Sequence, residues 1–320
     1  VMSFGERLAA LIISSYLNQL GFPCEWLDAR QLIKTNDQFG NAKVFESLTF
    51  ENIRKYFESH EKLQVVTGFA GSTSKGETTT LGRGGSDYTA ALFGAALGAD
   101  EIEIWTDVDG VLTTDPKKVQ DAFPQKSLSY VEAMELSHFG AKVIYPPTLQ
   151  PAFTEKIPLR IKNTFNPSFQ GTIISEMTEN KDFLIKGISS IENISLINLT
   201  GSGMVGVPGV SSRLFGTLAR NEINIILITQ ASSEHSICFA ISPDQTEQAK
   251  TAIEEEFSNE IMNHKIDEVK IQSGLSIVAI IGENMKNTPG ISGKLFEALG
   301  KNGINVVAIA QGSSELNLSV

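Results

Sequence analysis

VVTGFAGST, at residues 65–73, is a short apolar strand pattern that runs directly into a glycine-rich turn. TTTLGRGGSD, at residues 78–87, is a second glycine-rich stretch, and a helical pattern follows it to about Leu97. Glycine lets the backbone approach a ligand closely, and the first turn of a helix offers unpaired N–H groups to an anion. The two stretches therefore predict a pair of anion-binding loops.

The surrounding sequence, residues 1–175, alternates helical patterns with short apolar strands. The N-terminal helical pattern ends at Gly21, and strands are expected at residues 25–27, 63–69 and 101–106. This alternation predicts an α/β layer domain with a mainly parallel sheet. In such sheets ligands bind beyond the carboxyl ends of the strands, where the glycine-rich loops lie.

The second half of the chain contains a duplication. Residues 194–239 align without a gap on residues 275–320 at a constant offset of 81, with 17 identities in 46 positions. Each copy has the pattern of a strand, a Gly/Pro turn, an amphipathic helix, a strand, a polar turn and a strand. After the first copy, residues 244–257 predict a charged helix and residues 269–271 a strand.

These patterns give the expected domain organisation. Polar residues near 174–187 mark the end of the first domain, which therefore covers residues 1–175. A linker and first strand follow at residues 176–193, and one α+β unit covers residues 194–274. Residues 275–320 form a second unit, which stops before its final helix and strand. A helical pattern starts immediately after Val1, and a strand pattern is still running at Val320. We therefore expect the chain to be part of a longer protein.

Composition narrows the classes of function. The 320 residues carry a net charge of −11, which argues against a broad nucleic-acid surface because such surfaces cluster Lys and Arg. The sequence has no apolar run of the roughly 18 residues that span a bilayer and no signal-peptide pattern, so we expect a cytoplasmic protein without membrane contact. Cys24 and Cys238 show no CxxC or zinc-ligand spacing, so no metal site or disulfide is predicted.

Three motifs carry the chemistry. The first motif is the pair of glycine-rich stretches. There, Arg83 offers a planar set of hydrogen-bond donors for a carboxylate, whereas Ser86 and Asp87 either bind a ligand or only cap the following helix. WTDVDGVLTTDPKK, at residues 105–118, follows a strand and either holds ribose or hydrated Mg²⁺ or is simply an acidic turn. In FGAKV, at residues 139–143, Lys142 is a ligand cation or an ordinary surface lysine. Because no P-loop or protein-kinase motif occurs, the set favours phosphoryl transfer to a small anionic substrate by another fold.

SFGERL at residues 3–8, together with residues 68–90, 105–116 and 139–142, resembles the aspartate kinases. The turns that follow Gln230 and Gln311 resemble those of aspartate kinases fused to homoserine dehydrogenase. The resemblance implies an amino-acid-kinase fold of the carbamate-kinase-like type, MgATP as phosphoryl donor, and phosphorylation of the side-chain carboxylate of L-aspartate. This reaction begins the pathway to threonine, lysine and methionine.

The resemblance also implies residue roles. Aspartate would be bound by Glu6, Phe69, Arg83 and Ser86, catalysis would depend on Asp87 and Arg83, and ATP would be bound by Thr106, Asp107, Leu112, Lys117 and Lys142. Some relatives have Tyr at the position of Leu112 and Arg at that of Lys117. The Lys-Phe-Gly-Gly motif that opens aspartate kinases is absent, so we expect this chain alone to be a weak or inactive kinase. The alternative is an amino-acid-binding regulatory piece.

The repeats resemble paired ACT domains, which regulate aspartate kinases and join their subunits into oligomers. GSGMVG, at residues 201–206, also fits a dinucleotide fingerprint, which makes a dehydrogenase the rival hypothesis. The second copy, GENMKN at residues 282–287, loses two of those glycines, and this favours a role in chain geometry. Gln230 and Gln311 each precede a Ser-Ser-Glu turn, and the resemblance implies that they bind threonine as effector. The alternative is an inherited polar hairpin.

Overall fold

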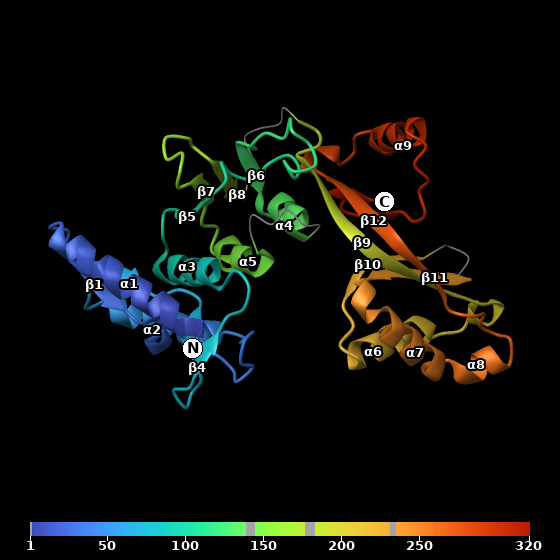
Figure 1. Cartoon of the computed structure of the whole chain (residues 1–320), viewed down its shortest axis with the longest axis horizontal. Helices are drawn as coiled ribbons and strands as arrows, with labels where there is room; N and C mark the ends of the chain where they lie inside the picture. The colour runs from blue at the N-terminus through green and yellow to red at the C-terminus, as the bar shows by residue number, and fades with distance from the viewer. Residues whose placement is uncertain (1, 139–144, 177–182, 231–234) are drawn as a thin grey trace. The chain divides into compact units, whose positions relative to one another are not determined.

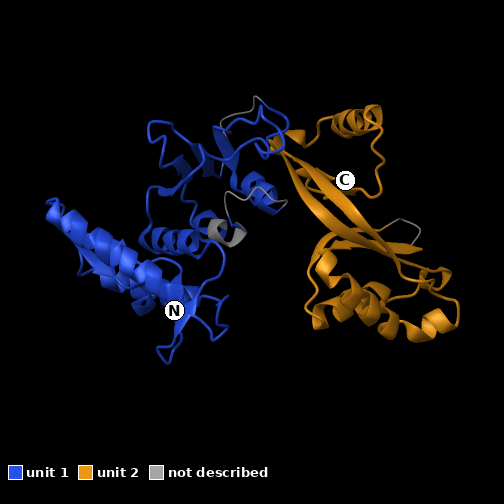
Figure 2. Ribbon diagram, viewed as in Figure 1, with its two compact units in different colours: residues 1–186 blue, residues 187–320 orange. Residues whose placement is uncertain are grey.

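The computed structural model describes residues 2–138, 145–176, 183–230 and 235–320. The chain forms two compact units, residues 1–186 and residues 187–320 (Figures 1 and 2). None of the helices in these described ranges has the length and apolar character that a membrane span requires.

The first unit alternates helices and short strands, as its sequence predicts. In chain order its described elements are α1 (Met2–Gln19), β1 (Cys24–Leu27), the 3₁₀ turn η1 (Ala29–Gln31), α2 (Glu46–Phe57), β2 (Leu63–Val66), β3 (Ala70–Ser72), β4 (Thr78–Thr80), α3 (Gly85–Leu97), β5 (Ile102–Thr106), β6 (Ser127–Ser129), α4 (Tyr130–His138), α5 (Pro146–Thr154), β7 (Leu159–Asn163) and β8 (Thr172–Ser175).

Strands β1 and β2 pair in parallel, with Leu27 opposite Val66. Leu27 packs into a core with Ile53 of α2 and Leu92 of α3, all three with at most 1% of their surface exposed. Strand β2 ends at Val66, three residues before the predicted end at Phe69. Phe69 has a φ of 69°, a conformation that a strand does not accommodate, so the chain turns there into the first glycine-rich loop.

Helix α3 begins earlier than its sequence suggests. Its N-cap is Gly84, whose φ of 69° lies in the left-handed region, and no side chain caps the helix. Ser86 and Asp87 are therefore inside the first turn, so of the two alternatives for these residues the one in which they only cap the helix is wrong. Gly98, with a φ of 63°, ends α3 in the conformation that glycine favours after a helix.

The remaining strands of the first unit form a four-stranded sheet in the order β5-β7-β8-β6. Strands β5 and β7 are parallel, as are β6 and β8, whereas β7 and β8 are antiparallel. The expected parallel pairing thus dominates. Strand β5 ends at Thr106, so the acidic loop within residues 105–118 starts at the carboxyl end of a strand. Ligands of α/β proteins commonly bind beyond such strand ends.

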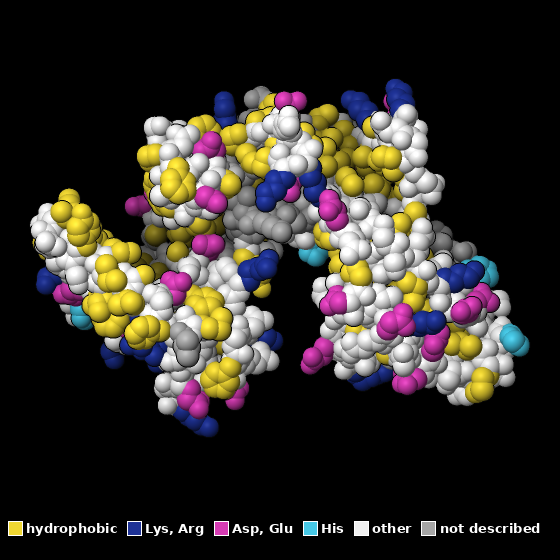
Figure 3. All heavy atoms as spheres, in the orientation of Figure 1, with side chains coloured by type: hydrophobic (Ala, Val, Ile, Leu, Met, Phe, Trp, Pro, Cys, Tyr) yellow, Lys and Arg dark blue, Asp and Glu magenta, His cyan; other side chains and the backbone are white. Residues whose placement is uncertain are grey.

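Helix α1 buries mainly small side chains. Ser3, Ala10 and Ser14 are covered, while Leu8 and Ile12 are 45% and 58% exposed. Figure 3 shows hydrophobic side chains along this helix at the surface. The sequence predicted the helix, but it did not indicate which residues of the helix face the interior.

The second unit contains a six-stranded sheet in the order β10-β11-β9-β12-β14-β13. Its elements are β9 (Gly187–Thr200), η2 (Ser202–Met204), α6 (Val210–Arg220), β10 (Ile225–Gln230), β11 (Ser236–Ile241), η3 (Pro243–Gln245), α7 (Thr246–Glu256), α8 (Ser258–Met262), β12 (Lys270–Ile281), η4 (Glu283–Met285), α9 (Ile291–Lys301), β13 (Ala310–Gln311) and β14 (Asn317–Ser319).

The two long strands of this sheet show that the repeats exchange strands. Asn198 of β9 lies opposite Lys270 of β12, and Ser189 lies opposite Ala279. Adding the repeat offset of 81 to Asn198 gives position 279, and subtracting it from Lys270 gives position 189, so one pair is the symmetry mate of the other. The first half of β9 therefore supplies the second repeat with the strand that the sequence alignment left unassigned, and the first half of β12 serves the first repeat.

Backbone conformation follows the same symmetry. Asn193 and Gly274, which are 81 positions apart, both have positive φ values, 54° and 73°, at the point where each long strand passes from one repeat to the other. The strand predicted at residues 269–271 is consequently the start of one continuous strand that ends at Ile281. The duplication thus includes the strand crossings as well as the segments that align by identity.

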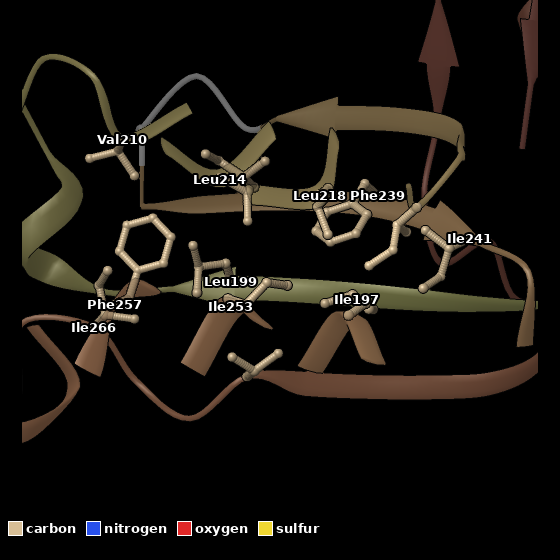
Figure 4. Packing of buried hydrophobic residues seen from close by; sticks show 14 of the residues in the cluster. Ile197, Leu199, Val210, Leu214, Leu218, Phe239, Ile241, Ile253, Phe257 and Ile266 are labelled. Atoms are coloured by element: carbon tan, nitrogen blue, oxygen red, sulfur yellow. The ribbon is translucent and has the colours of Figure 1, made fainter. Parts of the chain in front are cut away.

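The core of this unit lies mainly in the first repeat. Leu214 and Leu218 of α6 pack with Ile253 of α7 and Phe239 of β11, all fully buried (Figure 4). The corresponding cluster in the second repeat has only three buried members, Ile280, Met285 and Leu318. Since burying one such side chain contributes about 1.5–3 kcal/mol, the first repeat contributes most of the unit's hydrophobic stabilisation.

Candidate active site

The two glycine-rich loops of the first unit interlock at the N-terminus of α3. A Cβ atom on Gly68 would lie 3.0 Å from Cα of Ser86, and one on Gly85 would lie 2.8 Å from the ring of Phe69. The Phe69 N–H donates to Oγ1 of Thr89 in α3 at 3.1 Å, and the Phe69 carbonyl accepts from the Leu81 N–H at 2.9 Å. The glycines are therefore required by close packing, and the packing fixes both loops against the helix.

A cavity of about 790 Å³ opens beside this junction. Its lining includes Glu6 from α1, Gly68 from the first loop and Ser86 from α3. Two of the predicted substrate residues, Glu6 and Ser86, thus share one cavity although 80 positions separate them in the sequence. Phe69 and Arg83 are not among the described residues that line it.

Asp87 lies one residue beyond Ser86 and is partly buried in the first turn of α3. Burial raises the pKa of its carboxyl above the ordinary value, because the charged form loses hydration. The positive end of the helix dipole stabilises negative charge at the same place. A carboxylate with a perturbed pKa beside a cavity is typical of a functional site.

Arg83 occupies a loop whose backbone is fixed and whose side chain is exposed. Its neighbours Gly82 and Gly84 have φ values of 77° and 69°, and a Cβ on Gly84 would come within 2.5 Å of Tyr145. Within the described part of the chain, the Arg83 guanidinium has no carboxylate partner. An anchored loop with an unpaired guanidinium is suited to bind a carboxylate from solution.

A second group of predicted residues follows β5. The Thr106 hydroxyl donates to Oδ1 of Asp107 at 3.2 Å, and Asp107 is exposed. Leu112 forms a β-bridge with Pro124 and is partly buried, whereas Lys117 is exposed. Lys142, the remaining predicted nucleotide residue, lies outside the described residues.

Asp109 was missed by the sequence analysis as a structural centre of this acidic loop. Its Oδ1 accepts from the side-chain amides of Asn163 at 2.9 Å and Asn166 at 3.1 Å, both contributed by the end of β7 and the loop after it. Next to it, Gly110 has a φ of 129° and lies against Thr172. The two asparagines are more than fifty positions away, so local sequence gave no indication of this contact.

The two predicted effector residues occupy equivalent places. Gln230 lies opposite Ile237 in the β10–β11 pair, and Gln311 lies opposite Leu318 in the β13–β14 pair. Adding the repeat offset of 81 to both members of the first pair gives the second pair. Both glutamines are exposed, and they lie on β10 and β13, the two edge strands of the sheet. The turn at residues 231–234 lies outside the described residues.

The glycines of the apparent dinucleotide fingerprint have a packing role. A Cβ on either Gly201 or Gly203 would lie 2.4 Å from Lys265, and the Gly203 N–H donates to the Lys265 carbonyl at 2.8 Å. Helix α6 begins only at Val210, so its N-terminus does not directly follow the glycines. Chain geometry therefore explains this motif without a nucleotide.

Comparison with known proteins agrees with this architecture. Residues 1–163 match the amino acid kinase family, and residues 197–257 and 278–320 match an ACT domain. A bifunctional aspartokinase/homoserine dehydrogenase of Haemophilus influenzae is 41% identical over 98% of this chain, and the chain spans 39% of that protein's length.

Solved structures give the same assignment. E. coli aspartokinase III in complex with aspartate and ADP, described as the R-state, superposes with a TM-score of 0.83 and 34% identity over 98% of this chain and 70% of its own. The same enzyme with lysine and aspartate, described as the T-state, gives a TM-score of 0.74. The chain therefore belongs to the aspartate kinase branch of the amino acid kinase family, with a kinase domain followed by ACT domains.

Proposed function

We propose that the chain carries the acceptor site and nucleotide site for ATP-dependent phosphorylation of the side-chain carboxylate of L-aspartate. The observation that carries the proposal is the cavity at the N-terminus of α3, which both Glu6 and Ser86 line. Asp87 follows Ser86 in the first turn of α3, and the Arg83 loop directly precedes the helix. The solved E. coli relative was crystallised with aspartate and ADP, which supports the same ligands here.

The chemistry of aspartate suggests a role for each residue. The Glu6 carboxylate suits the substrate ammonium, and the Arg83 guanidinium suits one carboxylate in a two-pronged contact. Ser86 and the N–H groups at the start of α3 donate to the other carboxylate, which attacks the γ-phosphorus while ADP leaves with the bridging oxygen. Asp87 orients these groups. No proton transfer is needed, so positioning and charge carry the catalysis.

ATP lies at the carboxyl edge of β5 in this proposal, in contact with Thr106, Asp107, Leu112 and Lys117, with Lys142 as a further contact. Within the described ranges, no group of three or more His, Cys, Asp or Glu side chains could hold a metal by itself. Mg²⁺ commonly binds through phosphate oxygens plus one or two carboxylates, and the exposed Asp107 can supply one. The residues present therefore fit a metal that arrives with the nucleotide.

The proposal is tested by following ADP release with ATP, Mg²⁺ and L-aspartate, using both this chain and the complete product of its gene. L-asparagine is the matched control because it keeps the ammonium and α-carboxylate but has a neutral amide in place of the nucleophilic side-chain carboxylate. We expect release that depends on aspartate and saturates. If neither protein releases ADP but both bind an amino acid, the regulatory-piece alternative is correct.

Regulation is the second part of the proposal. Threonine binds through Gln230 and Gln311, whose amides offer both a donor and an acceptor to an amino acid. The equivalent exposed positions of the two residues support two related sites. ACT units of separate copies associate in this scheme. The solved E. coli relative in the T-state contains lysine, so the test compares threonine with lysine as inhibitor.

A further inference from the structure

A buried carboxylate outside the cavity holds two arginines. Asp28 follows β1, and its side chain is only 7% exposed. Arg30 donates to it through Nε at 2.9 Å and through Nη2 at 2.6 Å, a two-pronged pair. Nε of Arg7 lies 3.1 Å from Oδ2 of Asp28 and makes no hydrogen bond to any described residue, so the Asp28 charge is its only close partner.

The two arginines connect Asp28 to two structures that carry or lead to predicted substrate residues. Arg7 is next to Glu6 in α1, and Glu6 lines the cavity. Arg30 also donates from Nη1 to Oγ1 of Thr78 at 2.6 Å, at the first residue of β4. Strand β4 leads within three residues to the loop of Arg83.

Arg30 also contacts β3, which pairs with β4 to form the β3–β4 hairpin. The Arg30 carbonyl accepts from the Ser72 hydroxyl of β3 at 2.7 Å and from Nζ of Lys34 at 3.2 Å. One carboxylate is thus paired with Arg7 of α1 and with the Arg30 side chain, which contacts β4, while the Arg30 backbone contacts β3. Glu6 of α1 lines the acceptor cavity, whereas neither Asp28 nor a residue of the β3–β4 hairpin is among its described lining residues.

We propose that Asp28 is a positioning residue that sets the distance between Glu6 on α1 and the Arg83 loop, and so determines the affinity of the site for aspartate. The inference rests on the proposed function for its choice of substrate. The physical reason is that a binding constellation must be held within about 0.5 Å by supporting groups. The two-pronged pair with Asp28 holds the Arg30 guanidinium in fixed geometry, and the Asp28 charge attracts Arg7. Asp28 itself touches no substrate.

The alternative is that Asp28 forms an ordinary structural ion pair, and the first unit contains a suitable control. Glu101 and Arg160 also form a two-pronged pair, with distances of 2.7 and 2.8 Å, but Glu101 immediately precedes β5, Arg160 is in β7, and neither lines the cavity. Asp28→Asn and Glu101→Gln both remove one negative charge and keep the side-chain shape. Both variants lose an ion pair, so a difference between them reports on the place and the deeper burial of Asp28, whose side chain is 7% exposed against 30% for Glu101.

The test measures steady-state kinetics of both variants in the complete gene product. We expect Asp28→Asn to raise the KM for aspartate by about tenfold or more, because small misplacements of binding groups have large effects, and to leave the KM for ATP within about twofold. Glu101→Gln should change both values less than about twofold. Equal effects of the two variants, or a rise in the KM for ATP alone, would overturn the inference.

Two further measurements keep the inference testable in other circumstances. If Asp28→Asn does not fold, Arg7→Gln releases α1 while the Asp28–Arg30 pair stays, and it should raise the KM for aspartate in the same way. Amide hydrogen exchange does not depend on activity: Asp28→Asn should weaken protection in both α1 and residues 70–80, and Glu101→Gln in neither. Loss confined to residues 24–31 would overturn the inference. Absence of ADP release from the wild type would instead refute the proposed function.

Discussion

Replacing Asp87 by asparagine separates catalysis from helix stability. No side chain caps α3, so the substitution removes no capping bond, whose loss would typically cost about 1 kcal/mol. It removes the favourable effect of the helix dipole on a carboxylate, about 0.3–1 kcal/mol, and it also removes the cost of burying that charge. These effects oppose each other, so the free energy of unfolding should change by less than about 1 kcal/mol.

The effect on catalysis should be much larger. Losing one preorganised electrostatic group commonly lowers kcat by about 10²–10³, or roughly 3–4 kcal/mol in transition-state stabilisation. We would measure kcat at saturating aspartate and ATP, together with denaturant unfolding of the same preparations. A kcat within about threefold of wild type, or a loss of stability above about 2 kcal/mol, would refute the assignment of Asp87 as a catalytic residue.

The direction of the pKa shift adds a check on Asp87. Because burial raises its pKa in the folded state, the folded protein holds this proton more tightly than the unfolded chain. Its contribution to stability therefore falls as the pH rises from below about 3.8 through the raised pKa. Relative to wild type, Asp87→Asn should be more stable at pH 7 than at pH 4, and the opposite trend would contradict the buried environment.

The remaining predictions concern the loops and the repeats. Arg83→Lys should raise the KM for aspartate strongly and leave ATP binding unchanged, because a point charge does not reproduce a two-pronged contact; unchanged aspartate kinetics would remove Arg83 from the site. In Gly68→Ala the added Cβ would press on Ser86, so this variant should destabilise the protein by about 1–3 kcal/mol and impair aspartate use. Gly293→Ala is the control, because an added Cβ there has no atom within 4 Å, and it should have neither effect. Similar kinetics of both variants would contradict the interlocked loops. Gln230→Ala and Gln311→Ala should each raise the threonine concentration for half-inhibition, by up to about 150-fold, with uninhibited kcat nearly intact, and inhibition by lysine alone would refute the choice of effector.

Some features of the fold could be predicted because they depend on local pattern or on internal repetition. The helix and strand alternation of the first unit follows from periodicity, and the offset of 81 correctly places Gln230 and Gln311 in equivalent pairs. The start of α3 could not be read in the same way. Ser86 and Asp87 are good capping residues, but the left-handed Gly84 is the N-cap, and the helix starts at Gly85, three residues before the expected start at Tyr88.

Other features arise only from contacts between distant segments. Asp28 and Asp109 appear in the sequence as ordinary acidic residues, and their importance comes from Arg7 and from Asn163, which are 21 and 54 positions away. The strand exchange of β9 and β12 likewise follows from pairing that no single segment encodes. Supporting residues of a site are therefore harder to find from one sequence than its glycine-rich loops.

Product identification tests the central claim most directly. The complete gene product is incubated with ATP, Mg²⁺ and L-aspartate, the acyl phosphate is trapped with hydroxylamine, and the hydroxamate is identified by mass spectrometry and chromatography against both isomers. We predict the side-chain hydroxamate, formed in an amount equal to the ADP released. ADP release without a hydroxamate, or formation of the α-carboxyl isomer, would contradict phosphorylation of the aspartate side chain at this site.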